Sequence, residues 1–130
     1  MTTDLTRGTR RSRSWIGRTL LFLGAVALSS ALYLNFCDWI YDCGCQAWWS
    51  GGVTECNIHD ASTHDCPWCS HGFVGGYLPL ALVLVGHAAG AFLRYPGGWL
   101  TRILVTLLAF PVIGGLTGLA YGLVDGYWSA

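Results

Sequence analysis

Cysteine and histidine are concentrated in one segment of the chain. All six cysteines and three of the four histidines lie between residues 37 and 71. Thiols can pair as disulfides, and thiolates and imidazoles bind soft metal ions, so this segment is the first place to look for chemistry. It has no regular hydrophobic periodicity, and an irregular segment of this length needs covalent or metal cross-links to hold one structure. The cysteines are Cys37, Cys43, Cys45, Cys56, Cys66 and Cys69, and the histidines are His59, His64 and His71.

Disulfides are the first interpretation, and all six cysteines are candidates for them. The cysteine number is even, and six cysteines allow 15 pairings, among which the sequence does not choose. Cys43 and Cys45 are too close in sequence to pair with each other, so we expect them to have separate partners.

A metal site is the second interpretation, because the spacing in the second half of the segment is that of a ligand loop. Zinc takes four thiolate or imidazole ligands in a tetrahedron, and copper(I) also accepts thiolates. We expect four ligands from a set of five residues: Cys56, His59, Cys66, Cys69 and His71.

A redox-active pair is the third interpretation. Cys66 and Cys69 form a Cys-Pro-Trp-Cys motif just before an apolar stretch. A helix N-terminus there would lower a thiol pKa, and the pair could pass electrons between a soluble thiol protein and a membrane quinone. The five acids of the segment, with no Lys or Arg among them, disfavour such a thiolate.

The elements that position this segment are apolar. Three stretches, 19–36, 73–93 and 103–124, contain no Asp, Glu, Lys or Arg. Crossing the hydrocarbon core of a bilayer takes roughly 20 helical residues, and lipid requires the backbone to satisfy its own hydrogen bonds. The sequence therefore predicts an all-α membrane protein with three transmembrane helices and an irregular extracytoplasmic Cys/His loop between the first and second helices.

The arginines predict the orientation. Five of the seven lie in the first 18 residues, and the other two are Arg94 and Arg102. Cytoplasmic flanks retain Arg and Lys, so we expect a cytoplasmic tail over 1–18 and a cytoplasmic turn over 94–102. The loop 37–72 and the C-terminus 125–130 are then extracytoplasmic. A cleaved signal peptide over 7–31 is the competing interpretation of the first apolar stretch.

Small residues predict close helix packing. Glycines four residues apart share one helix face, which lets two helix backbones approach each other. These glycines are Gly86 and Gly90 in the second stretch and Gly114, Gly118, Gly122 and Gly126 along the third.

His87 is the one histidine inside an apolar stretch. It is either a cofactor contact, such as a haem or quinone ligand, or a neutral histidine hydrogen-bonded to a neighbouring helix through Ser29, Ser30 or Thr106.

These features favour a small non-catalytic membrane protein, an accessory or assembly subunit with a disulfide- or metal-stapled extracytoplasmic module. No phosphate-binding loop and no nucleophile–base pair point to an enzyme. The alternatives are a zinc- or copper-binding membrane protein and a quinone-linked thiol–disulfide oxidoreductase using Cys66 and Cys69. We expect the bilayer as partner, with other membrane subunits or a second copy of the chain, and no nucleic acid.

Overall fold

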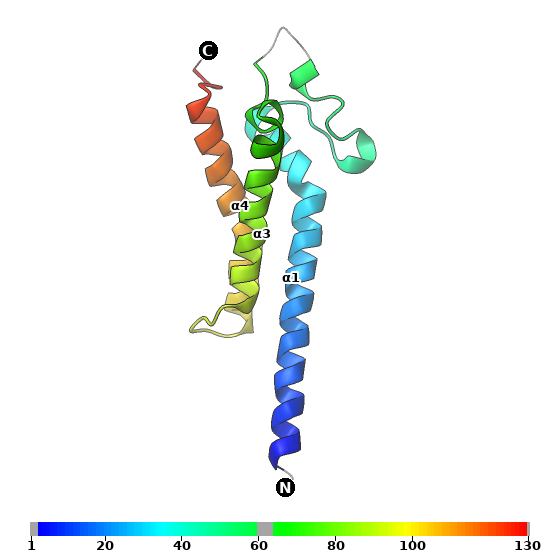
Figure 1. Cartoon of the computed structure of the whole chain (residues 1–130), viewed down its shortest axis with the longest axis vertical. Coiled ribbons are helices and arrows are strands. Elements are labelled where there is room, and N and C mark those ends of the chain that lie inside the picture. Colours follow the sequence, from blue (N-terminus) through cyan, green and yellow to red (C-terminus); the bar gives the residue numbers. More distant parts are fainter. Residues whose placement is uncertain (1–2, 60–63, 130) are drawn as a thin grey trace.

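The computed structural model describes residues 3–59 and 64–129, and its regular elements are all helical. Three long helices run alongside one another, with α3 and α4 joined by a short turn at the opposite end from the cysteine-rich region (Figure 1). That region follows α1 and lies at the same end as the C-terminus. In chain order the elements are α1 (Thr3–Tyr41), η1 (Trp48–Ser50), η2 (Asn57–His59), α2 (Pro67–Ser70), α3 (Gly72–Phe92) and α4 (Trp99–Val124).

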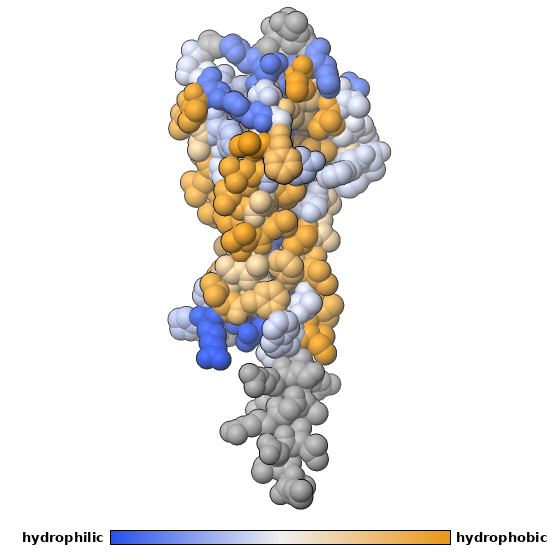
Figure 2. Space-filling model, in the orientation of Figure 1, coloured by the Kyte–Doolittle hydropathy of each residue, from blue (hydrophilic) through white to orange (hydrophobic). Residues whose placement is uncertain are grey.

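All three long helices are long and apolar enough to cross a membrane. The candidate spans are Ser14–Tyr41, Gly72–Phe92 and Trp99–Val124. Leucine and valine side chains along them are exposed on the outside of the bundle, where Figure 2 shows an apolar belt. A soluble protein of this size does not expose so large an apolar surface, so these spans suggest an integral membrane protein.

The helices extend beyond the apolar stretches from which they were predicted. The first reaches Tyr41 rather than residue 36, and α4 begins at Trp99 rather than residue 103. Both α3 and α4 continue through an internal proline, Pro79 and Pro111 respectively. The longer α1 matters most, because its last turns place Cys37 on a helix rather than in the loop.

Two glycines of α3 lie where this helix packs closest against α4. A Cβ atom built at Gly90 would stand 2.7 Å from the Cα atom of Thr106, which is backbone and cannot move aside. One built at Gly86 would overlap Ile113. The helices α3 and α4 can therefore lie this close together only because Gly86 and Gly90 have no side chain.

Two glycines of α4 face α1. Gly114 lies against the Phe36 ring, and Gly118 lies against Ile40. Gly122 is covered by the Trp128 indole, and Gly126 lies beyond the helix in a turn with φ of 66°. The small-residue face thus contacts α1 along two turns and the chain's own C-terminal segment at its end.

Arg102 fastens the turn between α3 and α4. Its guanidinium donates hydrogen bonds to the carbonyl oxygens of Ala91 and Leu93, at 2.5 and 2.9 Å. Those carbonyls end α3 and lack partners within the helix, so a cation there satisfies them and complements the helix dipole.

Candidate metal centre

Six thiols meet at the end of the bundle that carries the C-terminus. Cys37 comes from the penultimate turn of α1, Cys43 and Cys45 from the segment after it, and Cys56 from just before η2. Cys66 is the N-cap of α2, and Cys69 lies within α2. Cys69 is half-buried and the other five are buried. We refer to these six residues as the thiol cage.

The sulfur atoms of the cage are mutual neighbours. Among the described residues they include four triangles that share corners but no edge, and within each triangle all Sγ atoms lie within 4.8 Å of one another. Some contacts are closer, with Sγ–Sγ distances of 3.3 Å for Cys37–Cys66 and 3.4 Å for Cys56–Cys69. The triangles are Cys37–Cys45–Cys69, Cys37–Cys43–Cys66, Cys43–Cys45–Cys56 and Cys56–Cys66–Cys69.

No two sulfurs are bonded to each other. A disulfide needs about 2.05 Å between sulfurs, and all six cysteines, which lie within the described residues, are free thiols. The expected disulfide staple is therefore not seen. Each sulfur instead has several sulfur neighbours, which is the arrangement by which thiolates share metal ions.

The loop backbone is folded so that Cys43 and Cys45 both reach the cage. Gly44 between them has φ of 77°, and its N–H donates to the Asp38 carboxylate at 2.7 Å. A Cβ atom at this position would stand 2.6 Å from the carbonyl oxygen of Glu55. Glycine is required here by both the conformation and the close approach.

Asn57 ties together the segments that carry the ligands. Its backbone N–H donates to the Cys43 carbonyl at 2.8 Å, and its side-chain oxygen accepts from the Cys66 N–H at 2.9 Å. Its amide group also donates to the His64 carbonyl at 2.7 Å and to the Tyr127 hydroxyl at 3.2 Å. Through its backbone and side chain, this one residue links the segments of Cys43 and of His64 to Cys66 with the C-terminal turn.

Aromatic side chains close the side of the cage that faces the helix bundle. Trp68, which lies between Cys66 and Cys69 in sequence, stacks on Tyr33 with ring centroids 4.9 Å apart. Tyr41 donates from its hydroxyl to the Gly118 carbonyl at 2.5 Å and accepts at its own carbonyl from the Tyr127 hydroxyl at 2.6 Å. These contacts join α1, α2 and α4 around the thiols and exclude water from that side.

The thiols differ in acidity because of their neighbours. Hydrogen bonds from adjacent thiols, that of Cys37 first, hold the pKa of Cys43 and of Cys69 below the usual range. Burial raises the pKa of Cys56 to about 11. With no cation in the loop, a bound metal ion is the charge that would stabilise all six as thiolates.

Two cavities reach the cage from different sides. A mostly apolar cavity of about 510 Å³ touches Cys37 and Cys69 and is lined by aromatic and aliphatic side chains. A cavity of about 380 Å³ touches Cys43 and Cys56, and Asp42 and Glu55 line it. The second therefore gives a cation an acidic approach to the thiols.

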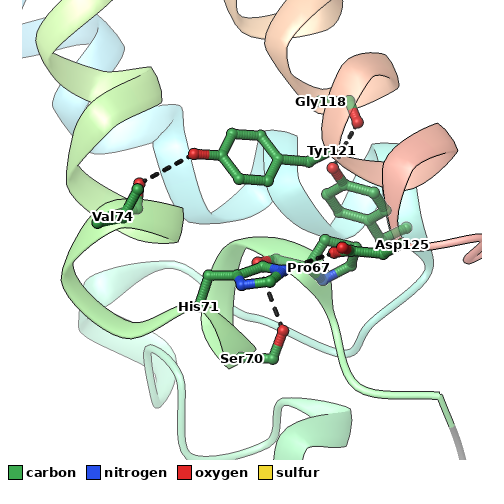
Figure 3. Close-up of polar contacts among 8 residues, drawn as sticks. Pro67, Ser70, His71, Val74, Gly118, Tyr121 and Asp125 are labelled. Atoms are coloured by element: carbon green, nitrogen blue, oxygen red, sulfur yellow. Dashed lines mark hydrogen bonds and ion pairs between the residues drawn. The ribbon is translucent and has the colours of Figure 1, made fainter.

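The histidines predicted as ligands are placed around the cage rather than in it. His71, between α2 and α3, binds the Asp125 carboxylate through Nε2 at 2.8 Å, as Figure 3 shows. In the same view the Tyr121 hydroxyl donates to the Val74 carbonyl, a second link from α4 to α3. His59 lines both cavities, and His64 is exposed. Of the five predicted metal ligands, the structure brings together the three cysteines.

His87 lies away from the cage, fully buried among the three long helices. Its Nδ1 is 2.7 Å from the Thr106 carbonyl, which can only accept, so Nδ1 carries the proton. Its Nε2 is 2.7 Å from the Ser29 hydroxyl, which then donates to it. Both ring nitrogens thus have protein partners on α1 and α4, as the hydrogen-bonding interpretation expects.

Sequence reasoning did not include Cys37, Cys43 and Cys45 in the metal set. The sequence predicted Cys37 as the first loop residue, yet it lies four residues before Tyr41 on α1, and the same helix face carries both toward the loop.

No protein-family model, no curated protein and no solved structure matches this chain. The geometry of the cage therefore carries the functional argument.

Proposed function

We propose that this chain is an integral membrane protein that holds soft metal ions in the thiol cage. The observation that carries the proposal is the convergence of all six cysteine sulfurs, five of them buried, into overlapping triangles without a disulfide. Soft thiolates select copper(I), zinc and iron–sulfur clusters over hard cations. The triangles account for every cysteine in the chain, which a single Cys-x-x-Cys redox pair would not.

The cage faces the extracytoplasmic side in this proposal. The N-terminus and the turn between α3 and α4 lie at the end of the bundle opposite the cage (Figure 1). That end also carries Arg94 and Arg102, and arginines next to spans favour the cytoplasm. A reporter enzyme fused to the C-terminus tests this, because alkaline phosphatase at that position becomes active in the bacterial periplasm and stays inactive in the cytoplasm.

The role that fits is a non-catalytic accessory subunit that binds metal. Trp39, Trp48 and Trp49 are exposed beside the cage, and aromatic side chains of this kind anchor protein interfaces or lie on headgroups. The partners in this proposal are the bilayer and other membrane subunits or a second copy of the chain.

Elemental analysis of the full chain, purified in detergent under reducing and anaerobic conditions, tests metal binding. We expect metal in a fixed ratio to protein, lost in Cys66→Ser and retained in His71→Ala. Alkylation followed by mass spectrometry gives the complementary count: six thiols that react only after a chelator is added. Six cysteines that react only after reduction, with no metal present, would contradict the proposal and restore the disulfide interpretation.

A further inference from the structure

We propose that the thiol cage binds four copper(I) ions, each held by one sulfur triangle, with all six cysteines bridging. This inference rests on the proposed function and names the metal, the number of ions and the role of each ligand.

The connectivity of the triangles carries the inference. The twelve sulfur pairs within the four triangles also close four further triangles: Cys37–Cys43–Cys45, Cys37–Cys66–Cys69, Cys43–Cys56–Cys66 and Cys45–Cys56–Cys69. Adjacent faces share an edge and cannot both hold an ion at full spacing, whereas the four triangles first named share corners only; ions in these four would make twelve metal–sulfur bonds, two for each of the six cysteines. The sulfurs therefore stand as the corners of an octahedron with a metal position on four alternate faces, and no corner is left unused.

Sets of three ligands match copper(I) better than zinc. Zinc in structural sites takes four ligands in a tetrahedron. In the described part of the chain no fourth Cys, His, Asp or Glu ligand atom joins any triangle within 4.8 Å. Copper(I) is a soft d¹⁰ ion that accepts three thiolates in a plane, and each triangle supplies such a set.

The size of the cage agrees with this assignment. A metal–sulfur bond of about 2.3 Å in a flat three-sulfur site places the sulfurs about 4.0 Å apart. Four of the Sγ–Sγ distances are 3.3, 3.4, 3.6 and 3.8 Å, and the remaining pairs within the triangles are within 4.8 Å. The closest pair would have to open by about 0.7 Å, and a pair at the 4.8 Å limit would have to close by about 0.8 Å, to seat the ions.

Charge balance also fits the anionic loop. Four Cu⁺ ions and six thiols give a cluster with a net charge of −2 and release six protons, with no change in oxidation state. Six thiolates without metal would carry −6, and one divalent ion would leave −4. Four copper ions thus remove most of the charge that would otherwise accumulate in a buried site.

The surroundings protect such a cluster from water. Cys37, Cys43 and Cys66 are buried, and Trp68 and Tyr41 cover the side that faces the helix bundle. Copper(I) is lost to oxidation when water and oxygen reach it, so a closed and thiol-rich site suits this oxidation state.

An anaerobic titration of the full-length reduced protein in detergent tests the proposal. The probe is Cu(I) supplied as its acetonitrile complex, with Zn²⁺ in a parallel titration. We expect saturation at four copper ions per chain, together with the orange luminescence that copper(I)–thiolate clusters emit when shielded from water. X-ray absorption should show three sulfurs around each copper and copper neighbours at about 2.7 Å, the spacing of alternate faces for about 2.3 Å bonds.

Cysteine variants separate this arrangement from a smaller site. In this arrangement each cysteine bridges two copper ions. Cys45→Ser should therefore abolish the four-copper form as completely as Cys66→Ser. His59→Ala is the control, because His59 lines both cavities but belongs to no triangle, and it should still bind four. If a cysteine variant fails to fold, the ion count and absorption spectrum of the unaltered chain still decide.

The outcomes distinguish this inference from the proposed function. Saturation at one or two ions of either metal, or four ligands around each ion, would overturn the four-copper cluster and leave metal binding intact. No stoichiometric uptake of either metal would overturn both. Unchanged copper binding in Cys45→Ser would also overturn the shared-corner arrangement.

Discussion

The Sγ atoms of Cys37 and Cys66 lie 3.3 Å apart although 29 residues separate them in the chain. The first belongs to the long helix α1 and the second caps the short helix α2, so this contact joins a candidate membrane span to the loop that follows it. Closing such a loop costs chain entropy, and a shared metal ion would offset that cost.

Gly44→Ala should weaken metal binding although it removes no ligand. The methyl group would meet the Glu55 carbonyl at 2.6 Å and would hold a side chain at φ of 77°. A strained backbone of this kind costs about 1–3 kcal/mol, which corresponds to a loss in affinity of roughly fivefold to somewhat more than a hundredfold. Competition with a copper(I) chelator measures the affinity. Gly98→Ala is the control, since nothing lies within 4 Å of the new atom and φ is −83°; equal affinities in the two variants would contradict the prediction.

Asp42→Asn with Glu55→Gln should slow metal uptake without changing how much metal is bound. Both carboxylates line the cavity that reaches Cys43 and Cys56, and neither belongs to a thiol triangle. Acidic walls raise the local cation concentration by an amount that falls as salt is added. Stopped-flow mixing with Cu(I) gives the rate at low and high ionic strength. A rate that is independent of salt in the unaltered protein would show that copper does not use this approach.

Ser29→Ala should destabilise the helix bundle. The Ser29 hydroxyl donates to His87 Nε2, and its loss leaves a buried acceptor between helices. Hydrogen bonds of this kind between membrane helices average about 0.6 kcal/mol and reach about 1.7. Unfolding in mixed detergent measures the change. Ser30→Ala is the matched control, because the Ser30 carbonyl, which accepts from Trp48 Nε1, is kept. Equal stabilities of the Ser29→Ala and Ser30→Ala variants would mean that the hydrogen bond to His87 contributes little to holding the helices together.

Gly90→Ala should disturb the contact between α3 and α4. Its Cβ atom would stand 2.7 Å from the Thr106 Cα atom, and overpacking of this kind costs typically 1–3 kcal/mol. Gly115→Ala is the control, since a Cβ atom there meets nothing within 4 Å. Thermal unfolding in detergent should separate the two variants. A Gly90 variant as stable as the Gly115 variant would mean that the helices can move apart at no cost.

Removing the metal should open the loop to proteases. Metal binding to a site that folds with it contributes directly to folding free energy. Limited proteolysis between Gln46 and Thr54 should accelerate on addition of a copper(I) chelator and remain slow with a thiol reductant alone. Protection that is lost on reduction and insensitive to chelator is the signature of disulfides, and would contradict the prediction.

The spans were predictable from the sequence because lipid imposes a simple rule of length and apolarity. The three apolar stretches follow from it. The four-residue spacing of glycines predicted close helix contacts, and the hydrogen bonds of His87 to Ser29 and Thr106 match one of the two interpretations that the sequence left open. The helix ends were less predictable. Asp38 interrupts the apolar pattern just after the predicted stretch ends at residue 36, yet α1 continues through it to Tyr41.

The ligand set was less predictable for a related reason. Short spacing favoured Cys56, His59, Cys66, Cys69 and His71, whereas the cage is assembled from distant segments. Asn57 and Gly44 set the loop geometry, and neither residue type signals a metal site by itself. Pairing of His71 with Asp125, from the far end of the chain, depends on where α4 ends, which spacing within the loop does not encode.

A peptide of the loop alone cannot contain the whole thiol cage, because Cys37 belongs to α1. Because this residue is part of α1 while Cys66 and Cys69 precede α3, a bound metal would hold two candidate spans together at the ends that carry the cage. A synthetic peptide of the loop alone would lack that clamp, and loading and unloading would be transmitted to the tilt of α1 against its neighbours. The amount of bound copper would thereby change how the candidate membrane spans are arranged.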